Sequence, residues 1–406
     1  MIEFKSLWLY FFHSVYILDN MEYVVLSVFS CICSNYLVPT AHMDEEFHVK
    51  QLSVYLSGDF WTWDPKITTL PGLYCFTYVV LKLTGIYYYF DLLALSRLVN
   101  TLLMIPFYFI LNALNPSCTS LVLAYPPLFM VSFLYYTDTI SLVFTVLALL
   151  LRKNHKNYSF LVSGFAVLCR QTNIVWIGYF VGMEILIEYQ IGEIKDCLKV
   201  VKDWKNVIKK YFLDILLAFG FCFFLYWNQG IVVGDRESHS VKLHLAQLCY
   251  LFGLSLLYIP FPQLSLKSNL ASFNFILSIP ILSFFTYNFS YAHPYLLSDN
   301  THYTFYIWKN LLKPYGSLLI PFYALGFTLL KQNKGLDFVW WLFCSSLVLV
   351  PAHLLEPRYF ITPITLYLIQ FKCEASKYRR VLVFVLNLVT LALFLMKPYK
   401  DIRFMW

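Results

Sequence analysis

Charged side chains are scarce in this sequence. Lysine, arginine, aspartate and glutamate together make up 13% of the 406 residues, whereas hydrophobic residues make up 59%. A soluble globular domain does not need so much apolar surface, so the composition excludes an ordinary soluble enzyme or binding module. The sequence contains apolar runs of ~20 residues, the length that crosses a hydrocarbon core of ~30 Å. It does not show the alternation of apolar and polar residues that is typical of a β-barrel. We therefore expect an all-α polytopic membrane protein.

Motifs for nucleotide chemistry and for metal binding are also lacking. The chain contains no P-loop, GxGxxG, HExxH or DxD, and the spacings His239-x4-His244 and His42-x5-His48 do not match metal sites. The ten cysteines form no CxxC pair and lie mostly in apolar runs, as buried small hydrophobes do. We expect neither a metal nor a cofactor. The net charge of +7 falls in short basic clusters between apolar runs, which argues against nucleic acid as a partner.

The apolar runs predict about 12 membrane spans in a single domain over 21–406. Cytosolic loops of membrane proteins carry an excess of lysine and arginine. Basic segments of this kind lie at 152–156, 195–210, 331–334 and 372–380. The opposite compartment then receives the loops 40–72, 230–245, 292–312 and 353–358. Residues 1–20 are expected to be an N-terminal segment outside this domain, and either Met1 or Met21 can be the native start.

One run in the first third does not fit this alternation. Four apolar runs between 73 and 151 would return the basic segment 152–156 to the same side as the loop 40–72. One of the four therefore does not cross. Because Pro126 and Pro127 interrupt the run 118–134, we expect that run to form a half-helix.

The most polar stretch of the chain lies at 42–72, and three consecutive carboxylates stand near its start, Asp44, Glu45 and Glu46. Carboxylates beside a membrane span are costly to place and usually have a chemical role. If 44–56 forms a helix, Asp44 is either its N-cap or a catalytic base with an unshared lone pair. The sequence leaves both roles open.

Helical phasing separates the side chains of 44–56 into faces. A polar stripe at i, i+4, i+7 and i+11 consists of Asp44, His48, Gln51 and Tyr55. The apolar side consists of Glu45, Val49, Leu52 and Leu56. Glu46 is expected to pair with Lys50 at i+4.

Two further groups of polar and aromatic residues lie on the same predicted side. Trp61 and Trp63, next to Asp64, are either anchors at headgroup depth or platforms for a sugar. Four donors fall within nine residues, and they are Arg236, His239, Lys242 and His244. These four form either a solvated loop face or a phosphate site close to the membrane. His302 is either a core histidine or another donor of the same kind.

Seven blocks of sequence carry a resemblance to a known family. They are Met43–His48, Trp63–Tyr74, Arg170–Asn173, Gly230–Arg236, Asp299–Trp308, Leu355–Ile361 and Arg403–Trp406. In this order, over about 21–406, they resemble the dolichyl-phosphate-glucose-dependent α-1,2-glucosyltransferases of the endoplasmic reticulum, the asparagine-linked glycosylation protein ten family. The resemblance implies a GT-C-type fold whose first luminal loop carries the catalytic acid. It also implies a multi-pass protein of the endoplasmic reticulum membrane with a luminal active site.

The resemblance further implies the two substrates. The donor is glucose β-linked to dolichyl phosphate, and the acceptor is the diglucosylated dolichol-pyrophosphate oligosaccharide, which gains a terminal α-1,2-linked glucose. Inversion from β to α fits one displacement with one base, which matches a single acidic loop better than the two carboxylates of a retaining hydrolase.

On this basis we expect specific roles for the candidate residues. Asp44 removes the proton of the acceptor hydroxyl, with Glu45 as the second choice. Donor phosphate is expected to contact Arg236, His239, Lys242, His244, His302 and Arg358. Sugar is expected to contact His48, Trp61, Trp63, Asp64, Asp299 and Tyr303. A phosphate held by protein cations needs no divalent metal, in keeping with the missing DxD.

Two other functions remain to be weighed. A transporter or channel would line its path with intramembrane charges such as Arg170 and Glu356. It should also show inverted repeats with matching broken helices, and we see none. A non-catalytic relative that binds lipid-linked sugar is the other alternative, and the retention of Asp44 argues against it.

Overall fold

The computed structural model describes residues 21–260, 269–298, 300–332, 334–371, 377–396 and 403–406. Over these residues the protein is helical and contains no strand, with an isolated parallel bridge between His302 and Met405. The all-α prediction is therefore confirmed for the described chain. The predicted N-terminal segment 1–20 lies outside the described residues.

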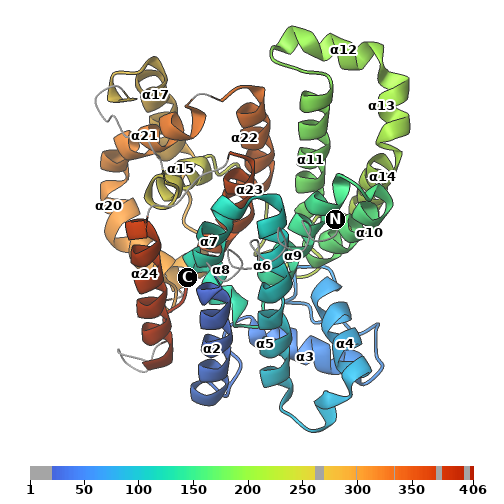
Figure 1. Ribbon diagram of the computed structural model, residues 1–406. Helices are drawn as coiled ribbons and strands as arrows, with labels where there is room; N and C mark the ends of the chain where they lie inside the picture. The colour runs from blue at the N-terminus through green and yellow to red at the C-terminus, as the bar shows by residue number, and fades with distance from the viewer. Residues whose placement is uncertain (1–20, 261–268, 299, 333, 372–376, 397–402) are drawn as a thin grey trace, which may run out of the picture.

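The first half of the chain forms a series of short helices that run from the bottom of Figure 1 (α2 to α4) to its upper right (α11 to α13). Their bounds are α2 Glu22–Leu37, α3 Glu45–Leu56, α4 Gly72–Thr84, η1 Ile86–Tyr88, α5 Leu92–Leu102, α6 Met104–Leu114, α7 Pro116–Ala124, α8 Pro126–Ser132, α9 Thr137–Arg152, α10 Lys156–Cys169 and α11 Asn173–Glu188. A loop segment follows, with η2 Ile194–Asp196, α12 Cys197–Lys202 and α13 Trp204–Lys210, and leads into α14 Phe212–Asn228.

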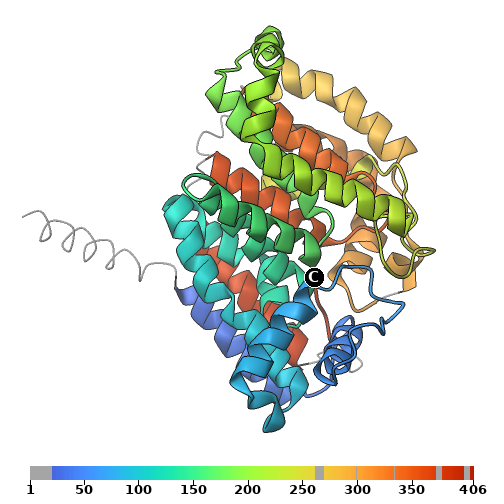
Figure 2. The same ribbon diagram turned by 90° about the vertical axis from the view of Figure 1, so that its right-hand side faces the viewer.

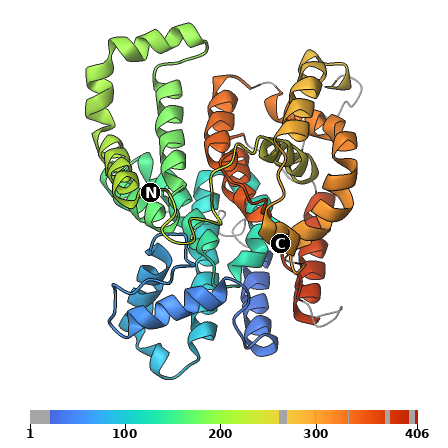
Figure 3. The same ribbon diagram turned by 180° about the vertical axis from the view of Figure 1, so that it is seen from behind.

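The second half continues with α15 Ala246–Tyr258, α17 Phe273–Asn288, α18 Pro294–Ser298, α19 Tyr303–Ile307, η3 Trp308–Leu312, α20 Lys313–Tyr315, η4 Gly316–Leu319, α21 Ile320–Lys331, α22 Leu336–Leu349, η5 Pro357–Phe360, α23 Ile361–Gln370 and α24 Lys377–Met396. The two ends of the described helical region lie side by side, because α2 packs against α24, with the rings of Tyr23 and Phe384 5.8 Å apart (Figures 1 and 3).

Few single helices are long enough to cross a bilayer. Among the described residues, two segments pass by length and composition, Leu92–Leu114 and Arg379–Met396. A third would be α8 and α9 taken together, but these two helices meet at an angle of 110°. Six shorter apolar helices of 10–17 residues are also present. The predicted number of about 12 spans therefore stays a prediction.

The chain does break at the proline pair. α7 ends at Ala124 and α8 begins at Pro126, with Tyr125 in an extended conformation at ψ 116°. A residue before proline is driven out of the helical region, which explains the break. All residues from 118 to 143 are buried. Broken helices at membrane depth are tolerated where protein covers them, so this turn is enclosed in the core as such a segment requires.

Candidate functional site

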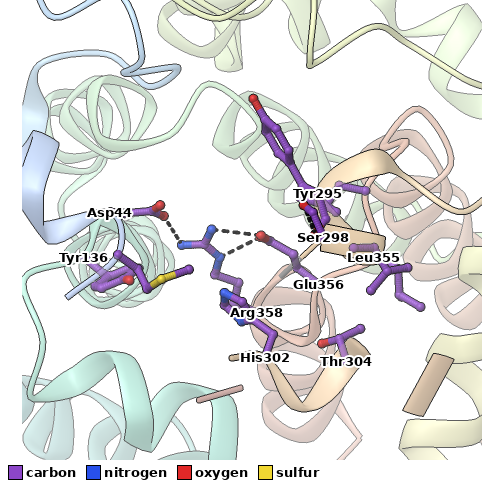
Figure 4. Close-up of a pocket in the computed structure, with 12 residues that line it drawn as sticks. Asp44, Tyr136, Tyr295, Ser298, His302, Thr304, Leu355, Glu356 and Arg358 are labelled. Carbon is purple, nitrogen blue, oxygen red and sulfur yellow. Dashed lines mark hydrogen bonds and ion pairs between the residues drawn. The ribbon is translucent and has the colours of Figure 1, made fainter. Parts of the chain in front are cut away.

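Asp44 occupies the N-cap position of α3, but its side chain caps no backbone N–H. Instead, Asp44 Oδ2 lies 2.9 Å from Arg358 Nη1 (Figure 4). The helix predicted over 44–56 is confirmed as Glu45–Leu56. The expected pair of Glu46 and Lys50 is also present, at 2.6 Å. The carboxylate of Asp44 is therefore directed at a partner 314 residues away rather than at its own helix.

Arg358 is held by more than Asp44. Glu356 accepts from its Nε at 2.6 Å and from its Nη2 at 3.1 Å, so these two side chains form a bidentate pair. The Tyr136 ring lies 5.4 Å from the guanidinium carbon. Asp138 Oδ2 is 3.9 Å from Nη1 and extends the cluster to Arg170, whose Nη1 lies 3.0 Å from Asp138 Oδ1. Glu356 thus fixes one edge of Arg358, and Nη1 is the nitrogen that reaches Asp44.

The charge of Arg358 keeps Asp44 and Glu356 ionised. Burial alone would raise the pKa of Asp44, but the charge of Arg358 holds that pKa below its ordinary value of 3.8. For Glu356 too, burial is outweighed by Arg358, and the pKa is lowered from 4.5. Burial lowers the pKa of His48 to about 4, so its imidazole is neutral at pH 7. Asp44 is therefore an unprotonated carboxylate, the state that a general base needs.

Two cavities adjoin this cluster. The smaller, of about 220 Å³, is shown in Figure 4 and includes His302 and Thr304 in its lining. The larger, of about 540 Å³, includes Thr68, Gln171 and Asn173. Residues shared by both linings are Asp44, Tyr295, Leu354, Glu356 and Arg358. The acidic and basic groups therefore stand where the two cavities meet.

The structure brings together only part of the predicted site. Asp44 and Arg358 line both cavities, His302 lines the smaller, and His48 and His239 line the larger. The predicted polar stripe of α3 is turned into the protein, because His48, Gln51 and Tyr55 are all buried. Gln51 there holds the loop 59–64, donating to Thr62 O and accepting from Asp64 N, both at 2.8 Å.

The other predicted phosphate donors lie away from these cavity linings. Arg236 Nη2 donates to Asn228 Oδ1 at 2.8 Å on the protein surface. Lys242 is exposed. His244 is fully buried, and its Nδ1 lies 3.1–3.2 Å from the carbonyl oxygens of Ala352 and His353. His244 thus holds the loop 352–353 in place, as a core histidine does.

The predicted sugar-binding residues also differ in their surroundings. Trp61 is 96% exposed, whereas Trp63 packs against Tyr74 and donates to Ile67 O at 3.3 Å. Asp64 accepts from the backbone N–H of Lys66, and Tyr303 packs on Trp406. Among the described residues, the linings of the two cavities do not include Trp61, Trp63, Asp64 or Tyr303. Asp299 lies outside the described residues.

Glu45 is fully buried and has a different set of partners from Asp44. Its two oxygens accept from Arg97 Nε at 2.8 Å and Nη2 at 2.5 Å. The backbone N–H groups of Tyr135 and His42 add two more bonds, at 2.8 and 3.0 Å. Arg97 itself also donates to the carbonyl oxygens of residues 34, 38 and 40. The carboxylate of Glu45 is thus engaged in holding the chain that leads into α3, although sequence phasing assigned it to an apolar face.

Sequence reasoning did not assign Arg97, Asp138 or Arg170 to the site or its support. Each is a charge at or inside an apolar run, and such a charge requires a partner. That signal could have identified all three as members of buried ion pairs. It could not have paired them, because the partners are far away in the chain.

The model of the DIE2/ALG10 family matches residues 38–369. The chain belongs to the DIE2/ALG10 family. Curated relatives named Dol-P-Glc:Glc(2)Man(9)GlcNAc(2)-PP-Dol alpha-1,2-glucosyltransferase include one from Homo sapiens, 33% identical over 90% of this chain and 93% of its own. Others come from Mus musculus, 32% identical over 90% and 93%, and from Arabidopsis thaliana, 29% identical over 91% and 94%. No solved structure matches this chain. The family match spans every cavity-lining residue named above, from Asp44 to Arg358.

Proposed function

We propose that this protein moves glucose from dolichyl β-D-glucosyl phosphate to the diglucosylated dolichol-pyrophosphate oligosaccharide, forming a terminal α-1,2 linkage. Family membership and the names of the relatives support this choice of substrates. The observation that carries it in the structure is the contact of Asp44 with Arg358 at the junction of two cavities. A transferase with two substrates needs a base and an anion-binding group close together. It also needs a cavity for each substrate next to these two groups.

In the proposed reaction, Asp44 accepts the proton of the acceptor 2-hydroxyl. The acceptor oxygen forms a bond to the anomeric carbon of the donor while the bond from that carbon to the phosphate oxygen breaks. The electron pair of the broken bond stays on dolichyl phosphate, whose developing charge is met by Arg358 and His302. Positioned bases contribute ~10²–10⁴ to a rate, and fixed donors ~10²–10³ each.

We assign the smaller cavity to the glucosyl phosphate and the larger to the acceptor saccharide. His302 and Arg358 give the smaller one two donors for phosphate oxygens. The larger carries Lys66 and Arg170 as well, but it adds uncharged hydroxyl and amide groups such as those of Thr68, Gln171 and Asn173, which suit sugar hydroxyls. We further propose a GT-C-type arrangement in the endoplasmic reticulum membrane, with the loop 40–72 on the luminal side.

The decisive experiment compares Asp44→Asn with Glu46→Gln in proteoliposomes supplied with both lipid-linked substrates. Glu46 is a matched control, because it is two residues away and forms a surface ion pair with Lys50. We expect Asp44→Asn to lose transfer by at least about 10²-fold and Glu46→Gln to retain it. Transfer by Asp44→Asn at the wild-type rate would overturn the proposal.

A further inference from the structure

The segment between α11 and α14 has a feature that the proposed reaction does not use. In the helical stretch formed by η2 and α12, large apolar side chains are open to solvent instead of packed. Ile194 is 79% exposed, Leu198 61% and Val201 65%, with Trp204 following at 55%. Ile194, Leu198 and Val201, at i, i+4 and i+7, lie along one side of this stretch, whereas Trp204 begins α13 after the break at Asp203. Apolar side chains at this spacing are normally buried. Here no described residue covers them.

A second stripe of lysines follows one position behind the first. Lys195, Lys199, Lys202 and Lys205 each come directly after one of the apolar residues. One residue in an α-helix turns the side chain by about 100°, so Lys195, Lys199 and Lys202 line the edge of the apolar face, while Lys205 belongs to the next helix, α13. Lysine stems at that edge can cover apolar surface while their ammonium groups reach polar headgroups. The two stripes together have the pattern of a helix that lies in a membrane interface.

The charge of the segment favours an anionic surface. Over residues 191–210, six lysines stand against three carboxylates, a net charge of 6 − 3 = +3. Lys195 pairs with Glu193 at 2.8 Å and Lys199 with Asp196 at 3.0 Å, and such exposed pairs are weak. Among the described residues, Lys202 and Lys205 are in no ion pair. Each lysine near an anionic leaflet contributes an attraction of its own.

The neighbouring helix α14 fixes the level of the segment relative to the bilayer. Its exposed side chains Phe212, Leu216, Phe219 and Phe223 form a stripe at i, i+4, i+7 and i+11, as on a helix that faces lipid. Its 17 residues span about 25 Å, close to the thickness of the hydrocarbon core. The far end carries exposed Tyr226 and Trp227, which suit the opposite interface. The residues just before Phe212 therefore lie at headgroup depth.

α12 lies one short helix, α13, further along from that level (Figure 1). α12 lies across the end of α11 in Figures 1 and 3, and it is seen nearly along its axis at the top of Figure 2. α14 ends at Asn228, next to the loop whose Ile231 and Asp235 line the larger cavity. We propose that residues 194–205 form an interfacial segment that binds anionic phospholipid headgroups on the side of the membrane opposite the candidate site. This inference does not depend on the proposed reaction.

The test places an environment-sensitive fluorophore on the apolar stripe of the full-length protein. Cys197 and Cys222 are exposed, so both are first changed to serine, and the probe is attached to Leu198→Cys. The protein is reconstituted in phosphatidylcholine vesicles with or without phosphatidylserine, and quenching is measured with acyl-brominated lipid and with aqueous iodide. We expect quenching by brominated lipid that rises at least about two-fold with phosphatidylserine and falls with added salt.

Two charge variants separate headgroup binding from simple contact with lipid. Lys202→Gln with Lys205→Gln should abolish the dependence on phosphatidylserine. The matched variant Lys309→Gln with Lys313→Gln removes two exposed lysines elsewhere and should preserve it. Iodide quenching of the probe that is equally strong in all vesicles would overturn the proposal. The apolar stripe would then be a candidate surface for a protein partner. Equal quenching in neutral and anionic vesicles would overturn the recognition of anionic lipid.

Discussion

Arg358 reaches Asp44 with a single nitrogen, Nη1 at 2.9 Å, while Glu356 holds its other edge through Nε and Nη2. The same guanidinium thus contacts the proposed base and lines the cavity assigned to donor phosphate. A phosphate that binds Arg358 competes with the carboxylate of Asp44 for the same positive charge. Donor binding would therefore weaken the hold of Arg358 on Asp44 and leave its oxygen available to the acceptor hydroxyl.

The first prediction concerns donor affinity in Asp44→Asn. Removing the competing charge should tighten the binding of dolichyl phosphate by a few-fold, up to about tenfold, although transfer is lost. Equilibrium binding to protein in nanodiscs measures this, with unphosphorylated dolichol as the control ligand. Weaker binding of dolichyl phosphate by Asp44→Asn would show that Arg358 does not serve both groups.

The second prediction concerns Glu356→Gln. Its neutral side chain cannot form the charged bidentate pair with Arg358, so the guanidinium loses its orientation. We expect kcat to fall by about 10² with the protein still folded. Steady-state transfer rates measure the effect, with the exposed Glu237→Gln as the matched control. Wild-type kcat in Glu356→Gln would mean that Arg358 needs no such support.

The third prediction separates Glu45 from Asp44. Glu45→Gln leaves Arg97 buried beside a neutral partner, which should cost about 3–5 kcal/mol of unfolding free energy. The surface variant Glu46→Gln should change it by less than about 0.5 kcal/mol. Thermal unfolding in detergent gives the comparison. If Glu45→Gln were as stable as wild type but inactive, Glu45 and not Asp44 would be the better candidate for the base.

The fourth prediction concerns pH. The ordinary pKa of a histidine is 6.5. In the folded protein the pKa of His48 is lowered to about 4, because burial disfavours its charged form. The unfolded chain therefore binds more protons between these two values, and stability should fall as pH drops from about 6.5 towards 4. The contribution is fully present above pH 6.5. His48→Gln removes this titration, so the difference in Tm between variant and wild type should depend on pH. A constant difference between pH 7.5 and 5 would contradict the assignment.

Local features of this fold could be predicted from the sequence. Helix 45–56 follows from the periodicity of its side chains, and the break before Pro126 follows from the geometry of proline. The contact of Glu46 with Lys50 follows from i+4 spacing alone. In each of these cases the interacting residues are neighbours in the chain, so local rules were sufficient.

Long-range partners could not be predicted in this way. Spacing places Glu45 on an apolar face, and Glu45 is indeed buried. Spacing does not predict its ion pair, because the partner Arg97 lies 52 residues away in the chain. His244 stood among four donors in sequence, yet it faces main-chain carbonyls from the loop after α22. Arg358 was named as one donor of six, and tertiary packing is what makes it the one that contacts Asp44.

The separation of 314 residues between Asp44 and Arg358 also bears on biosynthesis. A chain made from its N-terminus exposes the carboxylate of Asp44 long before residues 356–358 have been synthesised, whereas Glu45 obtains Arg97 after only 52 more residues. The partner of Glu45 is therefore available early in synthesis and the partner of Asp44 only late. Truncation anywhere before residue 356 removes both Glu356 and Arg358, and with them the guanidinium that contacts Asp44. The contact between Asp44 and Arg358 is thus completed only when the last part of the chain has been synthesised.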